Sequence, residues 1–106
     1  MALPVLTVVS ATVDPAQEEH LVAAYQAVLD ADVPDGILAS ALLRGDGNQW
    51  QITTVWRDRA ALDAMRARMH ARPELPAAPR VFREVGAEPT LAVLDVINGL
   101  QWRSTP

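Results

Sequence analysis

The sequence predicts an α+β fold in which one antiparallel sheet of four strands is covered by helices on one side. Four short runs rich in β-branched and other apolar residues are separated by turn sequences. Two stretches with helical periodicity follow the first and the third of these runs, and a short glycine-containing connection joins the second run to the third. A chain of 106 residues with this alternation is expected to form one domain.

The first strand is expected at residues 5–13. Both alternating sets of side chains in this run are nearly all apolar, which predicts a strand that is covered on both faces. Asp14 and Pro15 then open a helix, because aspartate accepts hydrogen bonds from free amides at a helix start and proline fits the first turn. The turn sequence at residues 33–36 places the end of this helix near Asp32. Its buried face is predicted from four residues at helical spacing: Leu21, Tyr25, Val28 and Leu29.

The second and third strands are expected at residues 37–44 and 49–56, joined as an antiparallel hairpin by residues 45–48. Asp58 caps the second helix. The buried stripe of this helix is predicted from helical spacing and comprises Leu62, Met65 and Met69.

A proline-containing break is expected at residues 72–79. Beyond it, the one-face spacing of Val81, Phe82 and Val85 favours a short third helix over a strand. The last strand is expected at residues 91–97.

The element order β-α-β-β-α-(α)-β, with right-handed crossovers, predicts a ferredoxin-like sheet with its helices on one face. The first and last strands are apolar at both parities, so a single copy would expose an apolar sheet face. We therefore expect a homodimer that closes sheet against sheet. Residues 1–98 are expected to form the domain and residues 99–106 a C-terminal tail.

Composition narrows the classes of function. The net charge of -4 argues against nucleic-acid binding, because such domains usually carry a basic stripe. The chain has no cysteine and no His-x-x-x-His pair, so neither a thiolate site nor such a histidine metal site is expected. Since no apolar run approaches the roughly 20 residues of a membrane span, we expect a soluble cytoplasmic protein with no membrane partner.

Charge is unevenly distributed along the chain. Every formal charge ahead of Arg44 is acidic, whereas arginines crowd the second half. Two interpretations remain open: solvated acidic and basic helix faces that lie near each other, or an arginine-lined mouth for an anionic or phenolate ligand.

The third expected strand ends at a tryptophan directly before a helix start. Strand alternation places four residues on one face of this strand: Trp50, Ile52, Thr54 and Trp56. If that face is turned toward the helices, Trp56 has Tyr25 or Leu29 and Met65 or Met69 as neighbours. Such a cluster is either ordinary core or the wall of a ligand pocket, and Trp56 can serve as both.

The element order, the turn Pro34-Asp35-Gly36 and the strand end Val55-Trp56 with an acidic cap two residues later resemble the antibiotic biosynthesis monooxygenase family of dimeric α+β barrels. The resemblance implies a cofactor-independent monooxygenase, or a related polyketide-tailoring enzyme, that acts on an aromatic phenol or hydroquinone. In the polyketide oxygenases, a tryptophan at the end of strand three lines the pocket, and Trp56 matches it. Their asparagine four residues earlier falls on Ile52.

The resemblance and the residue pattern together suggest a set of site residues. Trp56 would orient the substrate, and His70 would transfer protons because imidazole titrates near neutral pH. The remaining candidates would bind the substrate: Ser10, Tyr25, Ile52, Thr54, Met65, Met69 and Phe82. No cofactor and no metal are expected.

Other functions remain open. The alternative to the oxygenase is a non-catalytic dimeric barrel that binds a small hydrophobic ligand or acts as an interaction module, and the absence of the asparagine favours it. Haem degradation is a distant third, because the residues of that branch fall on Ser10, Met65 and Glu74. Asp95 interrupts an apolar strand and is expected either to pair with an arginine of this chain or of the dimer mate, or to act as a catalytic acid.

Overall fold

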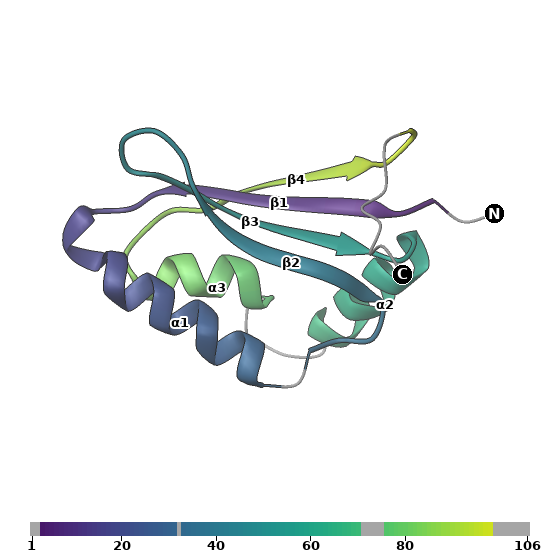
Figure 1. Ribbon diagram of the computed structural model, residues 1–106. Helices are drawn as coiled ribbons and strands as arrows, with labels where there is room; N and C mark the ends of the chain where they lie inside the picture. Colours follow the sequence, from purple (N-terminus) through teal and green to yellow (C-terminus); the bar gives the residue numbers. More distant parts are fainter. Residues whose placement is uncertain (1–2, 32, 71–75, 99–106) are drawn as a thin grey trace, which may run out of the picture.

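The computed structural model describes residues 3–31, 33–70 and 76–98, and the chain runs through four strands and three α-helices in the described part. Figure 1 shows the arrangement. The elements in chain order are β1 (Val5–Thr12), the 3-10 turn η1 (Pro15–Gln17), α1 (Glu18–Asp30), β2 (Ile37–Arg44), β3 (Gln49–Trp56), α2 (Arg59–His70), α3 (Ala77–Glu84) and β4 (Thr90–Asp95). The tail expected at residues 99–106 lies outside the described residues.

The four strands form one sheet in the order β2-β3-β1-β4, and every neighbouring pair is antiparallel. This order confirms the predicted ferredoxin-like α+β arrangement. All three helices lie on the same side of the sheet (Figure 1), and no described element covers the other side.

Several element bounds differ from the expected ones. The first helix begins as a 3-10 turn, in which the Asp14 carboxylate accepts a hydrogen bond from the Ala16 amide at 2.9 Å. The third helix is confirmed, but it begins at Ala77 and includes Pro79, which is tolerated because the first turn of a helix has free amides. The last strand ends at Asp95, two residues earlier than expected.

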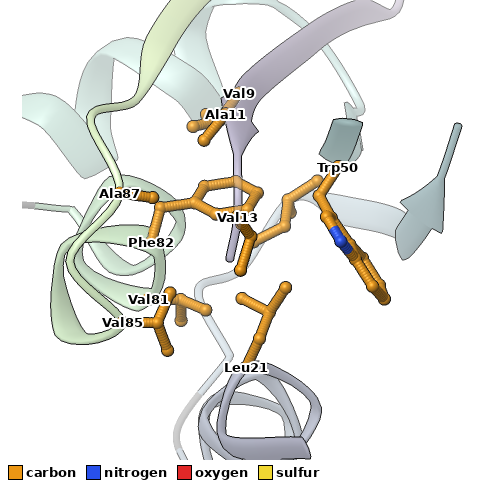
Figure 2. Packing of buried hydrophobic residues seen from close by; sticks show 10 residues of the cluster. Val9, Ala11, Val13, Leu21, Trp50, Val81, Phe82, Val85 and Ala87 are labelled. Atoms are coloured by element: carbon orange, nitrogen blue, oxygen red, sulfur yellow. The ribbon is translucent and has the colours of Figure 1, made fainter. Parts of the chain in front are cut away.

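The apolar core consists of two clusters at opposite ends of the sheet. The larger cluster joins β1 and β3 to α1 and α3, and in Figure 2 the Phe82 side chain points from α3 toward Val13 and Ala11. The smaller cluster joins the other ends of these two strands to α2 and comprises Val5, Trp56, Ala61 and Leu62. The two clusters leave a row of the sheet between them that belongs to neither.

That intervening row is polar. Along β3 the helix-facing residues are Trp50, Ile52, Thr54 and Trp56, and along β1 they are Val5, Thr7, Val9 and Ala11. Thr7 and Thr54 lie between the two clusters, directly opposite each other in register. Both are buried, so the sheet carries hydroxyl groups where its apolar core is interrupted.

The passage from β3 to α2 is held by local hydrogen bonds. The Asp58 carboxylate accepts from the Ala61 amide at 2.8 Å, which confirms the predicted cap. The Arg57 amide donates to the carbonyl oxygen of Gly36 at 2.7 Å, so the start of β2 is tied to the same corner. Gly36 has φ +93°, and a Cβ there would lie 2.5 Å from the Ala61 Cβ, so only glycine fits this approach.

The side of the sheet away from the helices carries a group of apolar side chains beside polar ones such as Gln51 and Thr53. By strand alternation it carries Leu6 and Val8 of β1, Val55 of β3, Leu43 of β2 and Leu94 of β4. Leu43 and Leu94 are 44% and 51% exposed. We refer to these five residues as the open sheet face.

In the described part of the chain, no helix is long and apolar enough to cross a membrane.

Candidate functional site

A cavity of about 280 Å³ lies between the sheet and the helices. Its floor is the polar row of the sheet together with the adjoining ends of both core clusters. Its walls come from α1, α2 and the start of α3, and the described lining residues are mostly apolar. The volume is close to the lower end of the range for small-molecule sites, which is about 300 to 1,000 Å³.

Trp56 forms one end of the floor. Its side chain is only 4% exposed, packs with Leu62 and Val5, and also lines the cavity. The indole nitrogen donates a hydrogen bond of 3.1 Å to the Thr7 hydroxyl. Because the ring is packed and hydrogen-bonded at once, it presents one fixed face to the cavity.

Three hydroxyl-bearing residues cross the floor in one row. Thr7 lies opposite Thr54, and Thr54 lies opposite Ser40 on β2. The Thr7 hydroxyl donates to the Thr54 carbonyl oxygen at 3.5 Å, and the hydroxyls of Thr54 and Ser40 are also 3.5 Å apart. From α1, the Tyr25 hydroxyl lies 2.7 Å from the Ser40 hydroxyl, so the row continues onto the cavity wall.

The walls add sulfur-containing and charged side chains. Met65, Arg66 and Met69 line the cavity from α2, and Arg80 lines it from α3. Arg66 makes no ion pair with any residue in the described ranges, and its side chain is half-buried. The cavity therefore has neutral hydroxyls on its floor and two arginine side chains in its walls.

Most of the residues suggested by the sequence meet at this cavity. Six of them line it: Tyr25, Ile52, Thr54, Trp56, Met65 and Met69. Leu29, which was expected on the buried face of the first helix, is 40% exposed but also lines the cavity.

Two suggested residues need correction. Ser10 alternates with the buried residues Val9 and Ala11, so its side chain lies on the opposite side of the sheet from the cavity. Phe82 is fully buried in the larger core cluster and does not line the cavity, because α3 turns Phe82 toward β1.

His70 ends α2, but its side chain lies outside the described residues, as does Glu74. Within residues 3–31, 33–70 and 76–98, no group of three or more histidine or acidic side chains is arranged to hold a metal ion. His20 is exposed on α1.

Asp95 lies away from the cavity at the end of β4. Its carboxylate is 56% exposed and forms an ion pair of 3.2 Å with Arg59 of the same chain. The pairing agrees with one of the two expectations, and the exposure removes the basis for a buried catalytic acid.

The sequence did not point to Thr7 or Ser40. Thr7 alternates along the first strand in phase with Val5 and Val9. Once the side of this strand that faces the helices is known, strand alternation therefore predicts that Thr7 faces the cavity. Ser40 offered no such signal, because β2 contains a register shift between Ile37 and Ala39.

The structure thus defines a small α+β protein with a ligand-sized cavity between its sheet and its helices. The model of the antibiotic biosynthesis monooxygenase family matches residues 4–72, and the chain belongs to this family. No match is found among curated proteins.

Similar solved structures cover nearly the whole chain. The cofactor-independent oxygenase SnoaB from Streptomyces nogalater is 27% identical, with a TM-score of 0.63 over 93% of this chain and 98% of that one. A putative antibiotic biosynthesis monooxygenase from Deinococcus radiodurans is 13% identical, with a TM-score of 0.67 over 94% and 99%. A heme-degrading protein from Mycobacterium tuberculosis is 21% identical, with a TM-score of 0.63 over 96% and 100%. The last two share the fold alone.

Proposed function

We propose that this protein is a cofactor-independent monooxygenase, or a related polyketide-tailoring enzyme, whose substrate is an aromatic phenol or hydroquinone bound in the cavity. The observation that carries the proposal is the position of Trp56, whose fixed ring borders a mostly apolar cavity beside a row of hydroxyls. The family and the similarity to the oxygenase from Streptomyces nogalater support the same class of reaction.

The chemistry needs no external reductant. When a ring CH₂ group is oxidised to a carbonyl, one atom of O₂ enters the product and the other leaves as water with the two hydrogens of the CH₂ group. The deprotonated substrate supplies the electrons itself, so the protein needs to orient the rings, exclude water and favour the anion. Arg66 and Arg80 would stabilise the phenolate from the cavity wall, and we propose His70 as the base.

We also propose that two copies associate through the open sheet face. These apolar side chains have no covering element in the described part of the chain, and exposed apolar patches mark sites of association. Association sheet against sheet would enclose them and leave the cavity, which lies on the helix side, accessible in each copy.

Oxygen consumption tests the enzymatic proposal. We expect the protein to accelerate the oxidation of 1,8-dihydroxyanthrone to the anthraquinone above its spontaneous rate, with one O₂ consumed per ketone formed and no accumulation of hydrogen peroxide. Heat-denatured protein provides the background rate. If oxygen uptake with a panel of anthrone-like phenols does not exceed this background rate, the proposal of an oxygenase is overturned.

A matched pair of tryptophan variants tests the role of Trp56. We expect Trp56→Phe to lower kcat/KM by about tenfold or more, because the smaller ring no longer fixes the substrate, whereas Trp50→Phe should stay within about twofold. Trp50 is equally buried in the same strand but does not line the cavity. Equal effects of the two changes would remove Trp56 from the proposed site.

A non-catalytic ligand-binding barrel is the second candidate. Ile52 favours it, because this buried side chain lines the cavity at the position where the polyketide oxygenases that the chain resembles have an asparagine. Saturable binding of the phenol panel without any oxygen consumption would establish this alternative in place of the enzyme.

A further inference from the structure

The hydroxyl groups of Tyr25, Ser40 and Thr54 form a connected cluster that reaches from the cavity floor to its wall. The Tyr25 and Ser40 oxygens are 2.7 Å apart, and the Ser40 and Thr54 oxygens are 3.5 Å apart. All three residues line the cavity. They come from α1, β2 and β3, so the cluster exists only in the folded chain.

The neighbouring hydroxyl of Thr7 is already engaged. It accepts from the indole nitrogen of Trp56 and donates to the carbonyl oxygen of Thr54. Thr7 is therefore a support for Trp56, and the other three hydroxyls are the ones available to a ligand.

The number of hydroxyl protons determines which hydrogen bonds the cluster can offer to a ligand. Each hydroxyl has one proton to donate and two lone pairs to accept, and the two contacts within the cluster use two of the three protons. One O–H donor is left over. The contact between Ser40 and Thr54 is also much longer than the usual O–H···O distance of about 2.7 to 2.8 Å, so an oxygen atom of a ligand can compete for the Thr54 hydroxyl.

We propose that Tyr25, Ser40 and Thr54 form the polar subsite that recognises the ring oxygen of the ligand, a phenolic hydroxyl or a carbonyl. This inference rests on the proposed function, since it assumes that the cavity takes an aromatic ligand. The subsite supplies the hydrogen bonding that Ile52 cannot provide, because Thr54 is the next residue on the same face of β3.

The cluster suits a ligand whose oxygen changes character. A phenolic hydroxyl can donate a hydrogen bond, whereas a carbonyl oxygen of the ring only accepts one. Rotation of the three O–H groups reverses the direction of both contacts without moving a heavy atom. The same subsite therefore accommodates the phenol and its oxidised form.

Matched ligands and matched variants test the subsite by equilibrium dialysis. The probes are 2-naphthol and naphthalene, which differ only in the hydroxyl group. The variants are Thr54→Val and Tyr25→Phe, which each remove one hydroxyl with little change of shape. The control is Thr53→Val, the same substitution on the opposite side of the same strand.

We expect the wild-type protein to bind 2-naphthol more tightly than naphthalene. Thr54→Val and Tyr25→Phe should each weaken the binding of 2-naphthol by about fivefold to tenfold, and the binding of naphthalene by less than about twofold. Thr53→Val should leave both affinities unchanged. Circular dichroism and urea unfolding of each variant verify that it is folded.

The two probes distinguish a failure of the proposed function from a failure of the subsite alone. If the wild-type protein binds neither probe, the proposed function falls and the subsite with it. If it binds both equally, or if the two variants weaken both probes to the same extent, the subsite alone is overturned and the cavity remains a site for aromatic ligands.

Discussion

The indole nitrogen of Trp56 donates a hydrogen bond of 3.1 Å to the hydroxyl of Thr7, although these residues are not direct partners across the β1–β3 pair. In register, Trp56 lies opposite Val5 and Thr7 lies opposite Thr54. The bond is thus diagonal, which a long aromatic side chain can reach across neighbouring strands. It connects the smaller core cluster to the polar row of the cavity floor.

This diagonal bond predicts a difference in stability between two tryptophan variants. Trp56→Phe removes the donor from the buried Thr7 hydroxyl, whereas the Trp50 indole nitrogen is buried with no hydrogen-bond partner in the described part of the chain. Both changes remove a similar amount of ring. We expect Trp56→Phe to lower the free energy of unfolding by about 1 kcal/mol more than Trp50→Phe. Urea unfolding measures both values, and a larger loss for Trp50→Phe would contradict the role of this bond.

Gly36 should be far less tolerant of substitution than Gly47. Both have positive φ, but a Cβ at Gly36 meets the Ala61 Cβ at 2.5 Å, whereas nothing lies within 4 Å of a Cβ at Gly47. Gly47→Ala should cost about 1 kcal/mol from backbone strain alone. Gly36→Ala should cost at least about 1 to 3 kcal/mol more, because strand and helix must separate. Equal unfolding midpoints for the two variants would show that this corner relaxes freely.

Stability and ligand binding should separate at Phe82 and Met69. Phe82 is fully buried outside the cavity, so Phe82→Leu should lower the free energy of unfolding by about 1 to 2 kcal/mol and leave the affinity for 2-naphthol within about twofold. Met69 is half-buried and lines the cavity, so Met69→Ala should have the reverse balance. Urea unfolding and equilibrium dialysis on the same preparations test this. A loss of affinity in Phe82→Leu without one in Met69→Ala would show that 2-naphthol does not bind in this cavity.

A charge on the open sheet face should dissociate the proposed homodimer. Val8 lies at the middle of β1 on that side, and Val8→Glu would place a carboxylate in an apolar contact. We expect sedimentation velocity to give a dimer for the wild type and for Ala23→Glu on the exposed side of α1, and a monomer for Val8→Glu. A monomeric wild type, or a dimeric Val8→Glu, would rule out association through this face.

Strand alternation predicted the cavity floor where the strand is regular. Trp50, Ile52, Thr54 and Trp56 do share the helix-facing side of β3, as period-two counting implies. On β2 the same counting fails, because Ile37 and Ser40 both line the cavity although they are three residues apart. The register shift between Ile37 and Ala39 adds one residue and reverses the phase, and the sequence carries no mark of it.

The predictions for Ser10 and Phe82 were wrong for different reasons. Ser10 lies in a strand that is apolar at both parities, so its sequence does not reveal which side faces the helices. Phe82 shares one face of α3 with Val81 and Val85, but the rotation of a short helix about its axis depends on what packs against it. Neither orientation is a property of the local sequence.

The cavity is assembled from two parts of the chain with different relationships to the family. The matched residues 4–72 contain the hydroxyl row, Trp56 and the walls from α1 and α2, whereas Leu91 of β4 and the wall from Pro76 to Val81 lie beyond them. Most of this wall belongs to α3, a short helix that contributes no strand to the sheet. Exchanging residues 76–81 between relatives is therefore a route to altered ligand preference on an unchanged scaffold, a modularity that the order of the segments alone does not reveal.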